Sequence, residues 1–253
     1  MPEGGAPRTV GAGEGAAYAG VRSFPGRFRA GEPVRRERAM ASRSPDDLVD
    51  AARAVGVTDE RVLGALRATP RAAFVPPEHR HSAYVDEPVP IPHGQVTTQP
   101  SLVARMVSQL APRADHRVLE IGTGYGFQTA VLARLAAHVV SVERWPDLAE
   151  AARRNLAARG VANVLVVVGD GTRGAPDWAP YDAVVVSAAF PEVPAPLVAQ
   201  LRVGGRLVQP IGPGGYERVT LFVRTRHGLR ERGLVTLAHF VRLYGEHAYP
   251  ERP

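Results

Sequence analysis

The chain has 253 residues, of which 45% are hydrophobic, and it contains no cysteine, which excludes disulfides, thiolate metal sites and cysteine nucleophiles. Its formal net charge is +6, but all 31 basic residues are arginine, and eight arginines with four glutamates place +4 of that charge in residues 1–43; we interpret the excess as a compositional bias and expect no nucleic-acid partner. No apolar run approaches the roughly 20 residues that span a bilayer, and no secretory signal is recognisable, so we expect a cytoplasmic protein without a membrane partner.

Residues 1–44 are rich in glycine, proline and arginine and show neither helical nor strand periodicity. Such a segment cannot bury enough apolar surface to order itself, so we expect a disordered tail. Met40 lies just before the first periodic segment and is an alternative start of the protein.

Two short amphipathic helices are expected next, over residues 45–57 and 58–68, each with acidic residues in its first turn. The stretch 69–91 is interrupted by prolines and is typical of a loop. Pro100, at a first helical position, predicts a further helix. Residues 45–112 therefore form a small N-terminal helical addition.

From residue 113 onward, strands and helices alternate. We expect strands over 117–121, 138–143, 163–168, 181–187 and 206–211, and helices over 127–136, 147–159 and 194–201. The second, third and fourth of these strands are apolar on both faces, as buried parallel strands are. Residues 217–228 and 229–245 are typical of a long antiparallel pair. The order predicts an α/β fold over 113–253: an open, doubly wound sheet, mostly parallel with an antiparallel C-terminal strand pair.

Three glycines separate the first strand of this sheet from its helix, in RVLEIGTGYGFQTAVLARL (residues 117–135). Gly122, Gly124 and Gly126 would let a ligand approach the backbone and the free amides of the helix N-terminus. The spacing is not the Gly-x-Gly-x-x-Gly of dinucleotide-binding proteins, because Phe127 occupies the last position. A triplet by itself is also compatible with a simple tight turn, under which Tyr125 and Phe127 merely pack.

Carboxylates at three successive strands favour a nucleoside ligand over a simple turn. Glu143 ends the second strand, 21 residues after Gly122, where an acidic side chain accepts the hydroxyls of a ribose. Asp170, followed by Gly171, ends the third strand, where an acid can meet an adenine amino group. Glu120 within the first strand suits a cationic ligand. S-adenosylmethionine, a nucleoside with a sulfonium, fits all three positions and would make the sheet a Rossmann-like class I methyltransferase fold.

Four segments besides the glycine turn have a distinctive sequence: PRAAFVPP (70–77), AYVDEPVPIPHGQVTTQP (83–100), VSAAFPEVP (186–194) and HFVRLYGE (239–246). With these segments, over about residues 45–245, the chain resembles the protein-L-isoaspartate O-methyltransferase family. The resemblance implies methyl transfer from S-adenosylmethionine to the free carboxylate of isoaspartyl residues in damaged proteins, followed by repair through a succinimide. Partners would then be proteins or peptides that contain isoaspartyl residues.

The resemblance also assigns roles to individual residues. Thr98 stands where the family has its key serine, and this hydroxyl would be the catalytic and substrate-contacting group. Residues 95–98 would close over the cofactor and the substrate carboxylate. Val96 in place of threonine and Arg242 in place of proline are further departures that bear on substrate scope. The cofactor-binding residues implied are Gln95, Val96, Thr97, Glu120, Gly122, Thr123, Gly124, Tyr125, Gly126, Glu143, Arg144, Asp170 and Gly171.

Several alternatives stay open at this point. Ser187, after the fourth strand, is either a substrate contact or an ordinary strand-end hydroxyl. The chain could be a homologue that methylates an aspartate in a dedicated biosynthetic peptide, or it could bind the cofactor without turnover. A nucleic-acid amino-methyltransferase is disfavoured, because SAAFPE stands where an Asp/Asn-Pro-Pro-aromatic motif would be. We expect no metal site, since His79 and His81 lack ligand partners at suitable spacing, and we expect a monomer.

Overall fold

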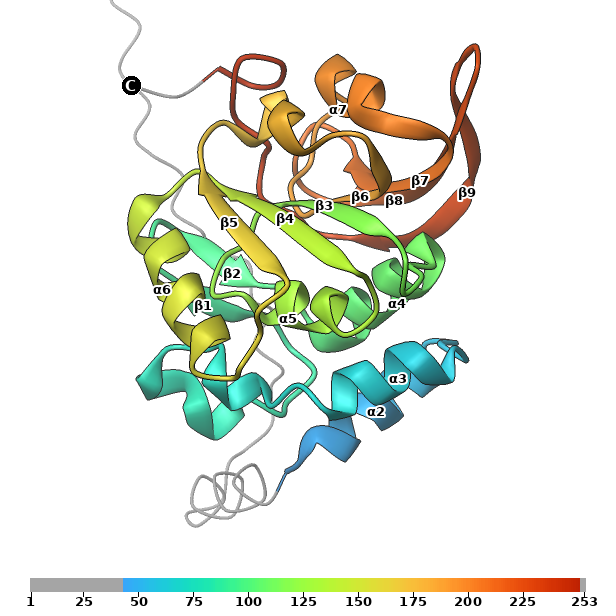
Figure 1. Ribbon diagram of the computed structural model, residues 1–253. Helices are drawn as coiled ribbons and strands as arrows, with labels where there is room; N and C mark the ends of the chain where they lie inside the picture. Colours follow the sequence, from blue (N-terminus) through green and yellow to red (C-terminus); the bar gives the residue numbers. More distant parts are fainter. Residues whose placement is uncertain (1–42, 251–253) are drawn as a thin grey trace, which may run out of the picture.

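The structure is a computed structural model that describes residues 43–250 (Figure 1). The tail expected for residues 1–44, apart from Arg43 and Ser44, and the alternative start at Met40 lie outside the described residues.

A seven-stranded sheet forms the centre of the molecule, with the strand order β5-β4-β3-β6-β7-β8-β9 (Figure 1). β3 pairs in parallel with both β4 and β6, so the strand order reverses direction at β3 and β6. The last two strands are antiparallel to their neighbours. This confirms the doubly wound α/β class. The strands are β3 Arg117–Ile121, β4 His138–Glu143, β5 Val164–Val168, β6 Tyr181–Val186, β7 Leu201–Ile211, β8 Glu217–Thr225 and β9 Gly228–Ala238.

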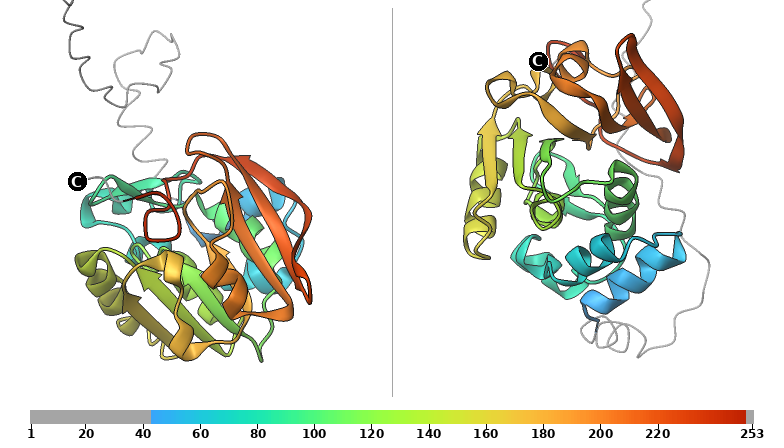
Figure 2. Two further views of the ribbon diagram at one scale, coloured as in Figure 1. Left: turned by 90° about the horizontal axis from the view of Figure 1, so that it is seen from above. Right: turned by 45° about the vertical axis from the view of Figure 1, so that its right-hand side comes forward.

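Helices cover both faces of the sheet, because alternate strand residues point to opposite sides. Val118 belongs to the core shared with the N-terminal helices, α5 and α6, whereas Leu119 packs with Leu197 of α7 and Leu243. Helices α2 and α3 and the C-terminal turn lie at opposite ends of the molecule (Figure 1 and Figure 2). The helices are α2 Pro45–Ala54, α3 Glu60–Arg67, α4 Pro100–Leu110, α5 Phe127–Ala133, α6 Pro146–Ala157 and α7 Ala195–Gln200, with short 3-10 turns η1 Arg71–Ala73, η2 Pro77–Ser82, η3 Gly171–Arg173 and η4 Pro176–Trp178.

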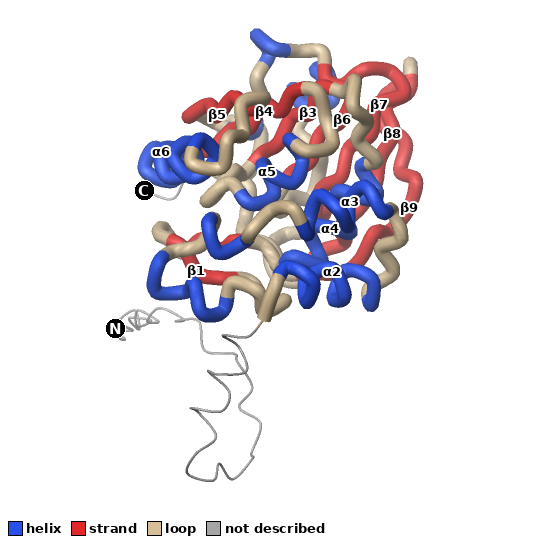
Figure 3. Tube along the Cα trace, turned by 60° about the horizontal axis from the view of Figure 1, so that its bottom comes forward, coloured by secondary structure: helices blue, strands red, loops and turns tan. Residues whose placement is uncertain are grey.

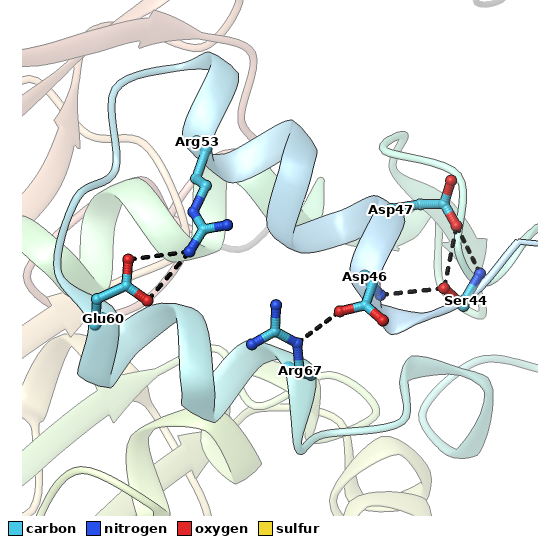
Figure 4. Close-up of polar contacts among 6 residues, drawn as sticks. All are labelled: Ser44, Asp46, Asp47, Arg53, Glu60 and Arg67. Carbon is cyan, nitrogen blue, oxygen red and sulfur yellow. Dashed lines mark hydrogen bonds and ion pairs between the residues drawn. The ribbon is translucent and has the colours of Figure 1, made fainter.

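The first two helices begin as their acidic first turns predicted. Ser44 and Asp47 cap α2 reciprocally: the Asp47 carboxylate accepts from the Ser44 backbone N–H at 2.7 Å, and the Ser44 hydroxyl accepts from the Asp46 backbone N–H at 3.3 Å (Figure 4). Apolar burial holds the pair against α4, while exposed ion pairs add little. These pairs are Arg53–Glu60 at 3.0 Å and Arg67–Asp46 at 2.6 Å.

A small hairpin that begins at the end of the expected loop was missed. β1 Val89–Ile91 pairs antiparallel with β2 Gln95–Thr97, apart from the main sheet (Figure 3). Each strand has only three residues, and Pro90 lies within the first, so no periodicity marks them. His93 and Gly94 both have positive φ, 62° and 65°, which lets the chain reverse between the two strands.

The expectation of a strand through residue 245 was wrong, because β9 ends at Ala238. Its partner β8 begins at Glu217, which pairs with Ala238, so residues after Ala238 have no residue of β8 to pair with. The Glu217 carboxylate instead accepts from the Phe240 backbone N–H at 2.9 Å. The chain then crosses to the end of β6, where Leu243 N–H donates to the Ala189 carbonyl at 2.8 Å. We call residues 239–245 the C-terminal crossing.

We expected strand 163–168 to be buried on both faces, and this expectation was also wrong. β5 is at one edge of the sheet, and its residues Leu165 and Val168 are 40% and 41% exposed. β4 and β6, which have neighbours on both sides, are buried as expected.

Candidate active site

A cavity of about 390 Å³ opens at the carboxyl ends of β3, β4 and β6, where the strand order reverses. This is where open α/β sheets bind ligands, and the size suits a small molecule. The walls come from the β1–β2 hairpin and the start of α4, the glycine turn, the β4–α6 loop, the residues after β6, and the C-terminal crossing.

The glycine turn joins β3 to α5 and requires its glycines for different reasons. Gly122, Gly124 and Gly126 all have positive φ, 95°, 55° and 92°, where other residues are strained. Gly122 and Gly124 line the cavity. Gly126 does not; a Cβ there would lie 3.4 Å from Leu156 Cγ of α6. The third glycine therefore serves helix packing.

Glu143 is held at the cavity wall by the backbone around it. Its Oε2 accepts from the Gly124 N–H at 2.8 Å, and its Oε1 accepts from the Trp145 N–H at 3.1 Å. The side chain is 5% exposed and lines the cavity. Each oxygen keeps a lone pair, so the carboxylate can still accept hydroxyl groups of a ligand. Its role toward a ribose stays a prediction.

Glu120 lies beneath the cavity rather than in its wall. It is fully buried and accepts hydrogen bonds from Gln128 at 2.9 Å, Thr129 at 2.5 Å and Ser141 at 2.6 Å. Burial raises the pKa of Glu120 to about 7, against the lowering effect of these bonds. It reaches the cavity only through Gln128 and, by way of Ser141, through Thr123. The predicted contact with a cationic ligand stays a prediction.

Gln128 is a cavity residue that sequence analysis missed. Its Nε2 donates to Glu120 and, at 3.0 Å, to the Ser187 hydroxyl. Its Oε1 is buried and has no partner among the described residues. A buried acceptor without a partner at a cavity wall fits a ligand donor such as an ammonium group. The available signal was a glutamine on the buried face of α5.

Residues 95–98 line the cavity from the hairpin side. Gln95 is oriented by a 2.9 Å bond from its Nε2 to the His93 carbonyl. Val96 is 45% exposed at the rim, and Thr97 is 7% exposed. Thr98 is partly buried and lies just before α4.

Arg71, which sequence analysis also missed, holds residues 97–98 in place through hydrogen bonds. The guanidinium is fully buried, which lowers its pKa to about 10 and leaves it charged at neutral pH. Such a charge needs hydrogen bonds on most of its donors. A single arginine in a proline-rich segment gave no sign of this burial. Its acceptors are the carbonyls of Ala83, Val85, Glu87 and Thr98 and the Thr97 hydroxyl, at 2.8–3.4 Å.

A stack of four side chains crosses one side of the cavity. The His93 ring stacks on the Trp145 ring, with 3.9 Å between the ring centres and 4° between the ring planes. Its Nε2 lies 2.9 Å from each carboxylate oxygen of Asp147. Arg144 lies 5.0 Å from the Trp145 ring and 5.4 Å from that of Tyr244. We call His93, Trp145, Arg144 and Tyr244 the strap, since they connect the hairpin, the β4–α6 loop and the C-terminal crossing.

Asp170 anchors the end of the chain and does not line the cavity. Its Oδ2 accepts from the Glu246 N–H at 2.8 Å, and its Oδ1 accepts from the Thr172 N–H and hydroxyl. Burial opposes ionisation, yet these bonds lower the pKa of Asp170. Gly171 does line the cavity, and a Cβ there would come 2.5 Å from Ile121. The adenine contact of Asp170 stays a prediction.

The structure thus brings most of the expected site residues to one cavity. Glu120, Gly126 and Asp170 are the exceptions. The cavity is lined by Gln95, Val96, Thr97, Thr98, Gly122, Thr123, Gly124, Tyr125, Glu143, Arg144, Gly171 and Ser187.

Two further searches cover residues 43–250. No group of three or more histidine, aspartate or glutamate side chains there is arranged to hold a metal ion. None of the helices in that part of the chain has the length and apolar character needed to cross a membrane.

Known proteins match this chain over most of its length. The family model of protein-L-isoaspartate(D-aspartate) O-methyltransferase matches residues 43–248. The protein-L-isoaspartate O-methyltransferase of Methanoculleus marisnigri is 55% identical over 183 residues, covering 72% of this chain and 80% of that protein. That of Staphylothermus marinus is 43% identical over 221 residues, covering 81% of this chain and 95% of the relative.

Solved structures agree with the sequence matches. One protein-L-isoaspartate O-methyltransferase aligns with a TM-score of 0.71 and 29% identity, covering 81% of this chain and 67% of that one. A Plasmodium falciparum protein in complex with S-adenosyl-L-homocysteine aligns with a TM-score of 0.70, covering 80% of this chain and 99% of that one. At 20% identity, the second likeness speaks for the fold alone.

Proposed function

Because this chain belongs to the protein-L-isoaspartate(D-aspartate) O-methyltransferase family, we propose that its cleft transfers a methyl group from S-adenosylmethionine to the free carboxylate of an isoaspartyl residue. The chain is an S-adenosylmethionine-dependent O-methyltransferase that acts on proteins or peptides containing isoaspartyl residues. The assignment of roles within the cleft is our proposal.

The cavity wall fits the cofactor in shape and in chemistry. Gly122 and Gly124 leave the turn without side chains, so a ligand can approach the backbone. Glu143 would accept hydroxyls of the ribose, and the unpartnered Gln128 Oε1 would accept the ammonium group of the methionyl part. When bound, the cofactor supplies an activated methyl group on a sulfonium, together with its own leaving group.

The remaining work of the protein is alignment of the acceptor. A carboxylate is ionised at neutral pH, so no general base is required. Thr98 and Ser187 both line the same cavity, and Gln128 Nε2 donates to the Ser187 hydroxyl at 3.0 Å. The hydroxyls of Thr98 and Ser187 would orient the acceptor carboxylate for in-line displacement, while the hairpin excludes water.

One observation carries the assignment of Thr98. Arg71 binds both the Thr97 hydroxyl and the Thr98 carbonyl, and this fixes residues 97–98 in the wall of the same cavity as the glycine turn. We infer that methylation serves repair, since an ester at this carboxylate can close to a succinimide. A cytoplasmic location and a monomeric state stay predictions.

The test is methyl transfer from labelled S-adenosylmethionine to an isoaspartyl peptide and to its normal aspartyl twin. We expect methylation of the isoaspartyl peptide alone. Methylation of neither peptide by a protein that binds the cofactor would contradict the proposal. Methylation of normal aspartate would favour a homologue dedicated to another peptide.

A further inference from the structure

Arg242 places a guanidinium at the mouth of the cavity, at a position where the resembled family has proline. It lies in the C-terminal crossing, and it lines the cavity together with Thr98 and Ser187. The residue is exposed, so its charge faces solvent at the edge of the cavity.

A hydrogen bond from Nε and a contact with an aromatic ring hold the Arg242 side chain in place. Nε donates to the Pro213 carbonyl at 3.1 Å, and the guanidinium carbon lies 5.2 Å from the centre of the Tyr249 ring. Gly214 makes room for it, since a Cβ there would come within 2.8 Å of the Arg242 side chain. Within residues 43–250, no group accepts a hydrogen bond from its two terminal nitrogens. A fixed guanidinium with both terminal nitrogens free is suited to a carboxylate.

Arg242 is also close to the reacting end of the cleft. It pairs in a parallel bridge with Ala189, and Ala189 N–H donates to the Val241 carbonyl at 2.7 Å. Ala189 follows Ser187 by two residues, so the guanidinium can reach an acceptor's neighbouring residue rather than the acceptor carboxylate itself. A charged group beside the reacting end, and not at it, affects which peptide binds more than it affects the rate of methyl transfer.

The fixed charges of the cleft agree with an anionic partner at this position. The only carboxylate among the described lining residues is Glu143, which is 5% exposed and bonded to two backbone N–H groups. The other arginine of the lining, Arg144, lies within the strap. No described lining carboxylate competes for Arg242.

We propose that Arg242 is a specificity-determining residue that binds the side-chain carboxylate of an aspartate or glutamate flanking the isoaspartyl residue. The proposal rests on the proposed function. It predicts that this enzyme prefers damaged sites in acidic sequence surroundings.

The test uses isoaspartyl peptides that carry glutamate or glutamine at each flanking position in turn. For the wild type we expect kcat/KM to be about three- to fivefold higher with glutamate at one position, mainly through KM, and the ratio to shrink at high salt. Arg242→Gln should bring the glutamate-to-glutamine ratio to about one, and Arg242→Lys should keep part of it. Arg113→Gln is the control: it removes the same charge from an exposed side chain before β3, at the amino end of the strands and so away from the cavity, and should keep the preference.

Two results would overturn the inference. A wild-type ratio of one at every position, or a ratio that survives in Arg242→Gln, would show that this guanidinium does not select the peptide. If no isoaspartyl peptide is methylated at all, the proposed function itself is wrong, and the inference is wrong with it.

Discussion

At the scale of single residues, the hydroxyl of Thr98 is the group on which the proposed alignment of the acceptor depends. Thr98→Val keeps the shape of the side chain and removes its only polar atom, so we expect turnover to fall by about tenfold to a hundredfold with nearly unchanged cofactor affinity. Thr98→Ser should retain activity on an isoaspartyl peptide, because the hydroxyl is kept and the extra methyl is removed. Single-turnover rates and calorimetry separate the two effects. Equal turnover of the wild type and Thr98→Val would show that the hydroxyl has no part in catalysis.

Glu120 should make the stability of the protein depend on pH. Its pKa is about 7 in the folded protein, against an ordinary value of 4.5, so the folded state binds the proton more tightly than the unfolded state. This stabilisation is fully present below pH 4.5 and is lost as the pH rises through about 7. Relative to Glu120→Gln, we expect the wild type to lose about 2–3 kcal/mol between pH 5 and pH 8. Urea unfolding of both proteins at the two pH values measures the difference; parallel stability profiles would contradict the prediction.

At the scale of elements, the strap should limit local opening of the β1–β2 hairpin. Trp145→Ala removes the surface on which His93 stacks and separates Arg144 from the hairpin. We expect faster amide hydrogen exchange in residues 89–98 and a higher KM for the cofactor, with unchanged protection in β3 and β4. Trp178→Ala is a matched control, because Trp178 is 37% exposed and does not line the cavity. Unchanged exchange in the hairpin of Trp145→Ala would show that the stack does not hold the hairpin.

The sequence predicted the elements whose signals are local. β3 and β4 have the expected bounds, and the glycine turn follows β3 as expected, with its three glycines at positive φ. It could not predict where β9 ends, because the chain is redirected there by distant partners, the Glu217 carboxylate and the Ala189 carbonyl, nor that β5 is an edge strand. Arg71, Gln128 and the strap were missed for a related reason. Their roles arise from partners that are 8 to 100 residues away in the chain.

At the scale of the whole molecule, residues 43–250 contain the two large hydrophobic clusters and the cavity walls described above. A shortened chain that begins at Met40 should therefore keep the melting temperature and the methyltransferase activity of the full chain. Differential scanning calorimetry and the peptide assay compare the two proteins under the same conditions. A drop of several degrees, or a loss of turnover, would show that residues 1–39 contribute to the folded protein.

The strap has a consequence for the sequence of events in a catalytic cycle. It borders the Glu143 side of the cavity, whereas Arg242 borders the mouth on the acceptor side. For a nucleoside to pass, three chain segments would have to part, whereas a peptide can come and go without disturbing them. We therefore expect ordered kinetics, in which the cofactor enters first and its demethylated product leaves last. That product would then compete with the cofactor but not with the peptide. A peptide that is not methylated could leave and be replaced while the cofactor stays bound, whereas each methyl transfer would have to be followed by exchange of the cofactor.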